Sequence, residues 1–384
     1  MLKIHIKQLL LTCLVSLCYL ATDSVLAQQA GLALKKEYPE LATFIDSFQV
    51  TQGAMLRKAV NISESPANAD ARNHFTHTLS MRAKNMTSHS MMSMHSEGAM
   101  NEMSMGVFGK IELDAIAELV DLVGKKHNPS VVKAAYADVP GFNRDVVNII
   151  ERGLVFRNQL FDIYANKGLT AKAKEDAVNA AISDYLQNKY ALTDKPKDPA
   201  LLDGRPYDTA FKLAFPEFNG LNWTTQWLEF ASLEALMVYG SDPKFDNSVN
   251  TVIERFNSKV NGISSPVPTE RPMAPVIAPM LYHRHPQAAI ILDNLNLFNV
   301  AVADILVHPG ISNKEKAMQQ AVKEFTSTTN LLDDYDYLYW ALRGGLFNQG
   351  GPALGATLTK SERNRTRAEM DMQHSMIMKV PAPQ

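Results

Sequence analysis

The sequence predicts an all-α protein, a multi-helix bundle that carries flexible Met/His-rich segments near both ends of its mature chain. Apolar residues recur at helical spacing along most of the 384 residues, and capping residues or prolines stand where these periodic segments start and stop. No run alternates apolar and polar residues on both sides of an Asn-Gly or Asp-Gly turn, which is the pattern of a hairpin. Helices that each bury one face must pack against one another, and this predicts the bundle.

The first 27 residues have the composition of an export signal. Lys3 and Lys7 precede an apolar run over 9–20, and the small residues before Gln28 predict cleavage after Ala27. The run is shorter than the roughly 20 residues that cross a bilayer, and no later stretch approaches that length without a charge. The sequence therefore predicts a periplasmic protein whose mature chain has no membrane span.

Both cysteines of the chain, Cys13 and Cys18, lie inside this predicted signal. A mature chain without cysteine has no disulfide, no thiolate zinc site and no covalently attached c-type haem, so its stability must come from a packed core. The composition permits such a core, because 46% of the residues are hydrophobic and 20% are charged. The formal net charge of -2 comes without a concentrated basic patch, which argues against nucleic acid as a partner.

The expected organisation is a signal at 1–27, an N-terminal helical segment at 28–80, a Met/His-rich tract at 81–105, an all-α domain at 106–360 and a Met/His-containing tail at 361–384. After Pro39 the apolar residues follow helical spacing, and this helix either continues past Met55 or gives way to a second one. The polar stretch 61–73 then interrupts the pattern. A helix is expected over 111–123, with apolar residues at 113, 116, 119, 120 and 123 and with Gly124 as its stop.

Two amphipathic helices are expected over 146–164 and 172–190, with Thr170 as the N-cap of the second. The proline-containing stretches 195–216 and 264–279 are expected to be irregular, because proline interrupts helices. Between them we expect helices over 223–239, capped by Asn222, and over 245–260. Pro286 suits the first turn of a helix that ends near Val307, and Ser312 is the expected cap of a helix that reaches Tyr339.

The helix that starts at Pro286 is apolar on nearly every side, which predicts that it is the most buried element. Asp293 and Asp304 share one face of it, and His308 follows one turn after Asp304. These residues either line a buried metal or ligand site, completed by Glu229 or Glu234, or form a hydrogen-bond network among buried polar groups. We favour the network. The chain has no Glu-x-x-His pair, which argues against a di-iron oxidase.

The run Asp333-Asp334-Tyr335-Asp336-Tyr337-Leu338-Tyr339-Trp340 combines acids with aromatic residues. It is either a recognition surface or the end of an amphipathic helix whose aromatic rings pack inward while its acids stay in water. We favour the second interpretation, because it is the commoner of the two patterns.

The tract 81–105 decides the functional interpretation. It holds eight of the 18 methionines and two of the ten histidines, and over 85–105 it has no Leu, Ile, Val, Phe, Tyr or Trp. These methionines therefore do not fill gaps in a normal core helix. Thioether sulfur is a soft donor that suits Cu(I), and imidazole accepts either oxidation state of copper. The expected ligands of this tract are Met81, Met86, His89, Met91, Met92, Met94, His95, Met100, Met103 and Met105.

Two further features favour copper over the other interpretations of such a tract, a disordered linker or a sacrificial oxidant sink. His74 and His77 stand at i and i+3 with Met81 one turn further, so a helix would present all three on one face. The C-terminal tail repeats the chemistry, and its expected ligands are Met370, Met372, His374, Met376 and Met378. By composition both segments resemble the Met/His-rich copper-binding segments of bacterial periplasmic copper-handling proteins.

These ligands predict a periplasmic copper-binding protein for storage, sequestration or delivery. The methionine clusters prefer Cu(I), and the histidines, helped by Glu97 or Asp371, also hold Cu(II). The expected partners are copper ions and a periplasmic copper transporter or cuproprotein. Flexible tracts with many ligands favour capture and exchange, whereas catalysis needs a fixed open coordination position. The alternatives are a periplasmic helical enzyme or ligand-binding protein with its site at Asp293, Asp304 and His308, and a scaffold protein without a small ligand.

Overall fold

The computed structural model describes residues 32–87, 106–238, 247–261 and 267–354. These residues form helices joined by turns and loops, and the one bridge found among them is an isolated antiparallel pair, Lys197 with Leu331. The predicted all-α class is therefore confirmed for the described part of the chain. The predicted signal, the stretch 88–105 and the tail 361–384 lie outside the described residues.

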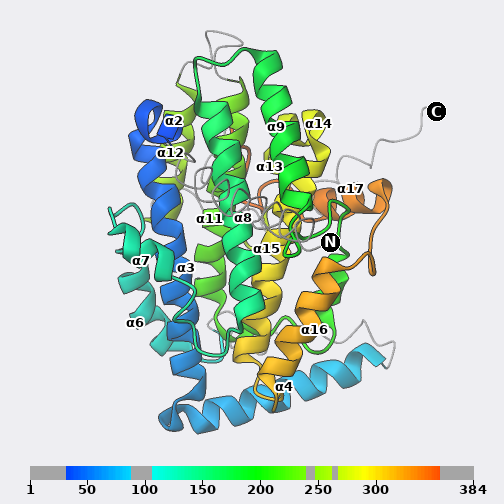
Figure 1. Ribbon diagram of the computed structural model, residues 1–384. Coiled ribbons are helices and arrows are strands. Elements are labelled where there is room, and N and C mark those ends of the chain that lie inside the picture. The colour runs from blue at the N-terminus through cyan, green and yellow to red at the C-terminus, as the bar shows by residue number, and fades with distance from the viewer. Residues whose placement is uncertain (1–31, 88–105, 239–246, 262–266, 355–384) are drawn as a thin grey trace, which may run out of the picture.

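Four long helices form the centre of the bundle (Figure 1). They are α3 (Pro39–Glu64), α8 (Arg144–Ala165), α11 (Pro216–Val238) and α15 (Pro286–Val307). Both α11 and α15 pack against α3 and against α8, so the four helices close into a ring around a shared interior. Side chains that point into this interior from the four helices face one another.

The central helices begin and pack as their residues dictate. A proline stands in the first turn of α3, α11 and α15, where its missing N–H removes no intrahelical hydrogen bond. In α15 every residue from Ala288 to Val307 except Asn299 is buried, so it is a core helix as predicted. It is not the most buried element, because α11 is buried without a break from Phe218 to Met237. By length and composition α15 would also cross a membrane, but it is 94% buried over its most apolar window, as a core helix is.

Shorter helices cover this centre. They are α2 (Leu32–Glu37), α4 (Ala69–Thr87), α6 (Gly109–Val120), α7 (Pro129–Ala134), α9 (Ala171–Leu186), α10 (Ala210–Ala214), α12 (Ser248–Val260), α13 (Ala274–Ile277), α14 (Pro279–Arg284), α16 (Lys314–Thr326) and α17 (Asp334–Arg343). α9 packs on α8, α12 on α11, α16 on α15, and α6 on both α3 and α11. α4 lies crosswise at the base of the bundle, and α17 lies at one side of it (Figure 1).

The predicted start of one helix is confirmed by its cap, whereas the predicted end of another is not. The hydroxyl of Thr170 accepts a hydrogen bond from the backbone N–H of Ala173 at 3.2 Å and starts α9. The predicted stop at Gly124 was wrong, because α6 already ends at Val120. Gly124 lies in the turn that follows, with a φ of 74°, and its N–H donates to the hydroxyl of Ser47 at 2.9 Å, which holds this turn against α3.

Other predicted boundaries were wrong. α3 is a single helix to Glu64, and the polar stretch 61–73 breaks it only between Ser65 and Asn68, after which α4 begins. α11 begins at Pro216 rather than after Asn222. Asn222 is buried inside this helix, and its side-chain oxygen accepts from the Gln52 amide at 3.0 Å. The side chain of Asn222 therefore has a buried hydrogen-bond partner and does not cap a helix. α9 ends at Leu186 rather than near 190, and α12 begins at Ser248 rather than near 245.

The predicted helix from Ser312 to Tyr339 is two helices. Asn313 caps α16 and Asp333 caps α17, each by accepting a backbone N–H three residues on. Between them Asn330 takes a positive φ of 51°. The ammonium group of Lys197 donates to the backbone oxygens of Glu324, Ser327 and Thr329. These hydrogen bonds satisfy carbonyl groups in the last turn of α16 and in the loop that follows it.

Candidate functional site

α4 presents three of the predicted copper ligands on one surface. His74, His77 and Met81 are all exposed, at i, i+3 and i+7 of this helix, so they share one face as predicted. Met81 is 44% exposed, so its side chain reaches solvent. Among the described residues neither imidazole has a hydrogen-bond partner.

The opposite face of α4 fixes the helix to the bundle. Phe75 and Leu79 are 1% and 3% exposed and belong to the main core. Arg72 donates to the backbone oxygens of Ser63 and Ser65 at 2.9 and 3.1 Å, which ties α4 to the end of α3. The buried face therefore fixes the rotation of α4, and the histidines and Met81 point away from the core.

Of the other predicted copper ligands, only Met86 lies within the described residues. Met86 belongs to the last turn of α4. The following predicted ligands lie outside the described residues: His89, Met91, Met92, Met94, His95, Met100, Met103, Met105, Met370, Met372, His374, Met376 and Met378. The structure thus places His74, His77 and Met81 on one exposed face of α4, and the joint site predicted for the two tracts stays a prediction.

Asp293 of α15 is held by protein partners on several sides. Its Oδ2 atom accepts from the Tyr337 hydroxyl and from the Ala274 N–H, the latter at 3.0 Å. Its Oδ1 atom lies 3.4 Å from an Arg271 guanidinium nitrogen. Burial raises the pKa of Asp293, and the neighbouring Arg271 charge and these hydrogen bonds oppose the rise. Such a carboxyl group is a structural link between α15, α17 and the loop before α13.

Asp304 and His308 have other partners. Asp304 accepts from the Phe211 N–H at 2.7 Å, and burial raises its pKa well above the usual range. The Nδ1 atom of His308 accepts from the Gly310 N–H at 2.9 Å, so its ring proton is on Nε2, which donates to Asp208 at 3.0 Å. The three predicted site residues thus contact different groups, which favours the network interpretation.

Substitutions at Asp304 test this interpretation. Asp304→Leu leaves the buried Phe211 N–H without an acceptor and is expected to lower the free energy of unfolding by about 1–3 kcal/mol. Asp304→Asn retains an acceptor oxygen and is expected to cost less. Urea unfolding measures both, and copper stoichiometry should stay unchanged in both variants. Loss of a tightly held ligand from a well-folded Asp304→Asn protein would instead identify a binding site.

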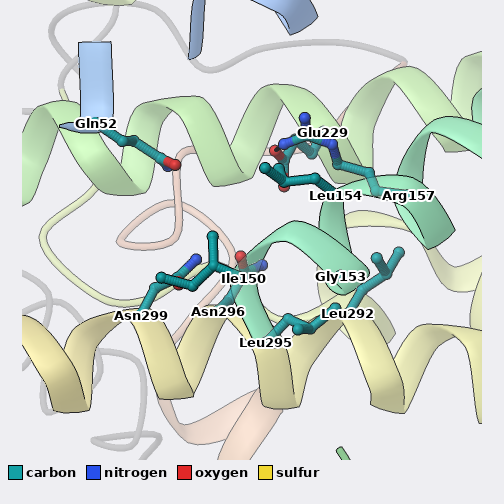
Figure 2. A pocket seen from close by; sticks show the side chains of 10 residues that line it. All are labelled: Gln52, Ile150, Gly153, Leu154, Arg157, Glu229, Leu292, Leu295, Asn296 and Asn299. Carbon is teal, nitrogen blue, oxygen red and sulfur yellow. Dashed lines mark hydrogen bonds and ion pairs between the residues drawn. The ribbon is translucent and has the colours of Figure 1, made fainter. Parts of the chain in front are cut away.

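A polar cavity lies at the centre of the helix ring (Figure 2). Its volume is about 30 Å³, enough for one or two water molecules. Each central helix contributes a polar residue to the lining: Gln52 from α3, Arg157 from α8, Glu229 from α11 and Asn296 from α15. Arg157 and Glu229 form a buried ion pair. Burial raises the pKa of Glu229, and the Arg157 charge opposes the rise.

The donor groups of this cavity determine what it can hold. The Nε and Nη2 atoms of Arg157 and the Nδ2 atom of Asn296 are buried and lack hydrogen-bond partners among the described residues. Three groups that donate hydrogen bonds fit water, which accepts as well as donates. A metal ion needs several anionic or neutral ligands, whereas the only carboxylate of this lining is paired with Arg157. No group of three His, Cys, Asp or Glu that could hold a metal occurs within the described ranges.

A wider groove of about 940 Å³ lies where α8 ends and α9 and α14 approach. Most of its basic residues form ion pairs or hydrogen bonds with other groups of the protein. Lys172 pairs with Asp176 at 2.7 Å, and Lys174 donates to the backbone oxygen of Tyr164 at 2.7 Å. Burial lowers the pKa of His285, which also lines the groove, so this imidazole is neutral near pH 7.

Glu112 and Arg157 are among the buried charged residues that the sequence argument missed. Glu112 is 0% exposed, its Oε1 atom accepts from the Phe218 N–H at 2.7 Å, and burial raises its pKa to about 8. Its position in the helix could have predicted its burial, because Glu112 shares a helix face with Ile116 and Leu119. Leu113, on another face, is 43% exposed. Arg157 follows Gly153 by one turn and so falls on the apolar face of α8.

Within the described part of the chain, the geometry offers an exposed face of α4 with two imidazoles and a thioether, and several buried networks that join helices. Comparison of the chain with protein-family models, with curated proteins and with solved structures gives no match in any of the three.

Proposed function

We propose that this protein is a periplasmic copper-binding protein that stores, sequesters or delivers copper. One observation supports this proposal most directly: His74, His77 and Met81 are exposed on one face of α4, where the Met/His-rich tract begins. Exposed residues at i, i+3 and i+7 lie on one side of two helical turns and have side chains long enough to converge on one ion. Two imidazoles and a thioether are ligands that suit copper.

The position of α4 suits capture followed by transfer. Its inner face is anchored by Phe75 and Leu79, so the outer face holds its ligands in a fixed register. The tract that follows offers methionines that can replace one ligand at a time, which favours exchange over permanent burial. The recipient in this proposal is a periplasmic copper transporter or cuproprotein. The predicted signal at 1–27 supports export, and the hydrophobic core of the bundle supports a mature chain without a membrane span.

The α4 face is tested by a triple variant, His74→Ala with His77→Ala and Met81→Leu. We expect it to weaken the tightest copper site by at least about tenfold, because one or more ligands must be replaced by water or by a donor from elsewhere in the tract. Anaerobic competition of full-length protein with a calibrated Cu(I) chelator measures this change. His283→Ala, which removes an exposed histidine of α14, is the matched control and should leave the affinity unchanged.

Deletion of 88–105 separates metal binding from the linker interpretation. The deletion is expected to remove most of the Cu(I) stoichiometry while helix content and melting temperature change little, because this segment has no Leu, Ile, Val or aromatic residue to bury in the core. Metal analysis and circular dichroism give the two readouts. Unchanged stoichiometry would contradict the proposal and leave the linker or oxidant-sink interpretation.

A further inference from the structure

α17 carries a second apolar face that points away from the protein. Its inner face holds Tyr337 and Ala341, which are 2% and 0% exposed. Its outer face holds Tyr335, Leu338, Tyr339 and Leu342, which are 76%, 37%, 56% and 71% exposed. These four residues, here called the outer stripe, stand at i, i+3, i+4 and i+7, the spacing of a helix face that packs against another helix.

The inner face fixes the orientation of α17, so the outer stripe is a stable surface. The Tyr337 hydroxyl donates to the buried carboxylate of Asp293, and Asp333 caps the first turn. At the other end the Gln349 amide donates to the Ala341 backbone oxygen at 2.7 Å. The sequence argument placed the aromatic rings of this run inward, and for Tyr335 and Tyr339 that prediction was wrong. Tyr337 alone among the three tyrosines is buried.

The outer stripe is symmetric in a way that suits a second copy of the same helix. A two-fold axis midway between Leu338 and Tyr339 sets Leu338 beside Tyr339 of the other copy and Tyr335 beside its Leu342. Every contact then joins an aromatic ring to a leucine, so the same four residues serve both sides of an isologous interface. Covering exposed apolar side chains of this size removes them from water, which stabilises the complex.

The charges at the two ends of α17 select the antiparallel direction. Asp333, Asp334 and Asp336 are exposed at its N-terminal end, and Arg343 is exposed at its C-terminal end. In an antiparallel pair the acidic end of one helix lies beside the end of the other that carries Arg343. A parallel pair would place three acids beside three acids, which is unfavourable. The helix dipoles favour the antiparallel pair as well.

We propose that two copies of this protein associate through their outer stripes, with the two α17 helices antiparallel about a two-fold axis. A ten-residue helix is about 15 Å long, so a contact confined to it buries less area than a permanent dimer needs. The association is therefore weak and reversible, and the dimer becomes populated at roughly 10–100 µM chain.

Sedimentation equilibrium of the full chain, from about 1 to about 500 µM, tests the association. We expect the wild-type chain to shift from monomer to dimer, and Leu342→Asp to remain monomeric. The matched control Leu113→Asp changes an equally apolar exposed residue on α6 and should dimerise as the wild type does. Circular dichroism verifies that both variants keep their helix content.

Single cysteines test the direction, in a background with Cys13 and Cys18 replaced by Ser. Leu338→Cys is expected to form a disulfide-linked dimer with diamide, because it lies next to the proposed axis. Tyr335→Cys should not link to itself, since its two copies lie about 10 Å apart along the helices, but it should link to Leu342→Cys in a mixture. Self-linking at all positions would indicate a parallel pair and overturn the proposed arrangement.

A wild-type chain that stays monomeric throughout overturns the proposal, as does a Leu342→Asp chain that dimerises normally. Dimerisation that appears only after removal of residues 355–384 would show that the tail of the same chain covers the stripe. That outcome also overturns association between complete chains. The result is independent of the copper proposal, because the outer stripe contains no copper ligand.

Discussion

At pH 8 the Glu112→Gln variant is expected to be more stable, relative to the unchanged chain, than it is at pH 4. Glu112 is fully buried, and its pKa is raised from 4.5 to about 8 because burial disfavours the charged carboxylate. The glutamine is neutral at every pH and retains an oxygen that can accept from the Phe218 N–H. The variant therefore removes a group that resists ionisation inside the protein.

The sign of the effect follows from proton binding. Between pH 4.5 and about 8 the folded state keeps the proton on Glu112, while the unfolded chain has released it. Stability contributed by this proton is present at low pH and is lost as the pH rises through that window. Over the whole window the difference between the two proteins is expected to change by up to about 5 kcal/mol in favour of the variant.

Urea unfolding at pH 4, 6 and 8 measures this change, with the urea slope held constant between the proteins. Glu118→Gln is the matched control, because it removes a carboxylate from the same helix whose side chain is 70% exposed. Because this side chain is solvated, the control should change the pH dependence of stability much less than Glu112→Gln does. Parallel pH curves for Glu112→Gln and the unchanged chain would mean that Glu112 is ionised in the folded protein.

Other buried acids act in the same direction. Burial raises the pKa of Glu234 to about 7 and raises the pKa of Asp304 further above its ordinary value. The unchanged chain is therefore expected to lose stability from mildly acidic towards alkaline pH, and Glu112→Gln removes only its own share of that loss. A shallow acidic optimum is the measurable consequence for the wild-type protein.

The sequence predicted local features well where one residue type determines the backbone. Pro286 starts α15 and Thr170 caps α9, because proline in a first turn and a hydroxyl at an N-cap satisfy local requirements that no distant residue changes. The end of α16 was missed because the Lys197 ammonium group that satisfies its last carbonyl groups comes from a loop more than a hundred residues earlier.

In the candidate site, too, local spacing predicted some features, whereas others depend on residues far away in the sequence. The shared face of His74, His77 and Met81 follows from helical spacing alone, and the structure adds that this face is exposed. The pairing of Arg157 with Glu229 joins residues 72 positions apart, and helical register cannot say which partner a buried charge finds. Register does show that Arg157 falls on an apolar face, so the existence of a buried partner was predictable although its identity was not.

Replacing Arg157 by Met is expected to lower the free energy of unfolding at pH 7 by about 3–5 kcal/mol. The substitution leaves Glu229 buried at 6% exposure without its cation, and a buried charge without a partner is far less stable than the same charge in water. Arg152→Met on the same helix is the control. Asp184, its partner, is 44% exposed, so water replaces the lost pairing and the cost should be about 1 kcal/mol or less.

The loss caused by Arg157→Met should shrink as the pH falls. Arg157 lowers the pKa of Glu229, so its removal raises that pKa further above the unfolded value. Stability is then regained as acid protonates Glu229 in the folded state, and it is lost again as the pH rises. Adding Glu229→Gln to Arg157→Met should recover part of the loss at pH 7 and remove its pH dependence. Equal losses for Arg157→Met and Arg152→Met would show that water in the central cavity already solvates Glu229, and the cavity would then be an open polar channel rather than a closed ion-pair network.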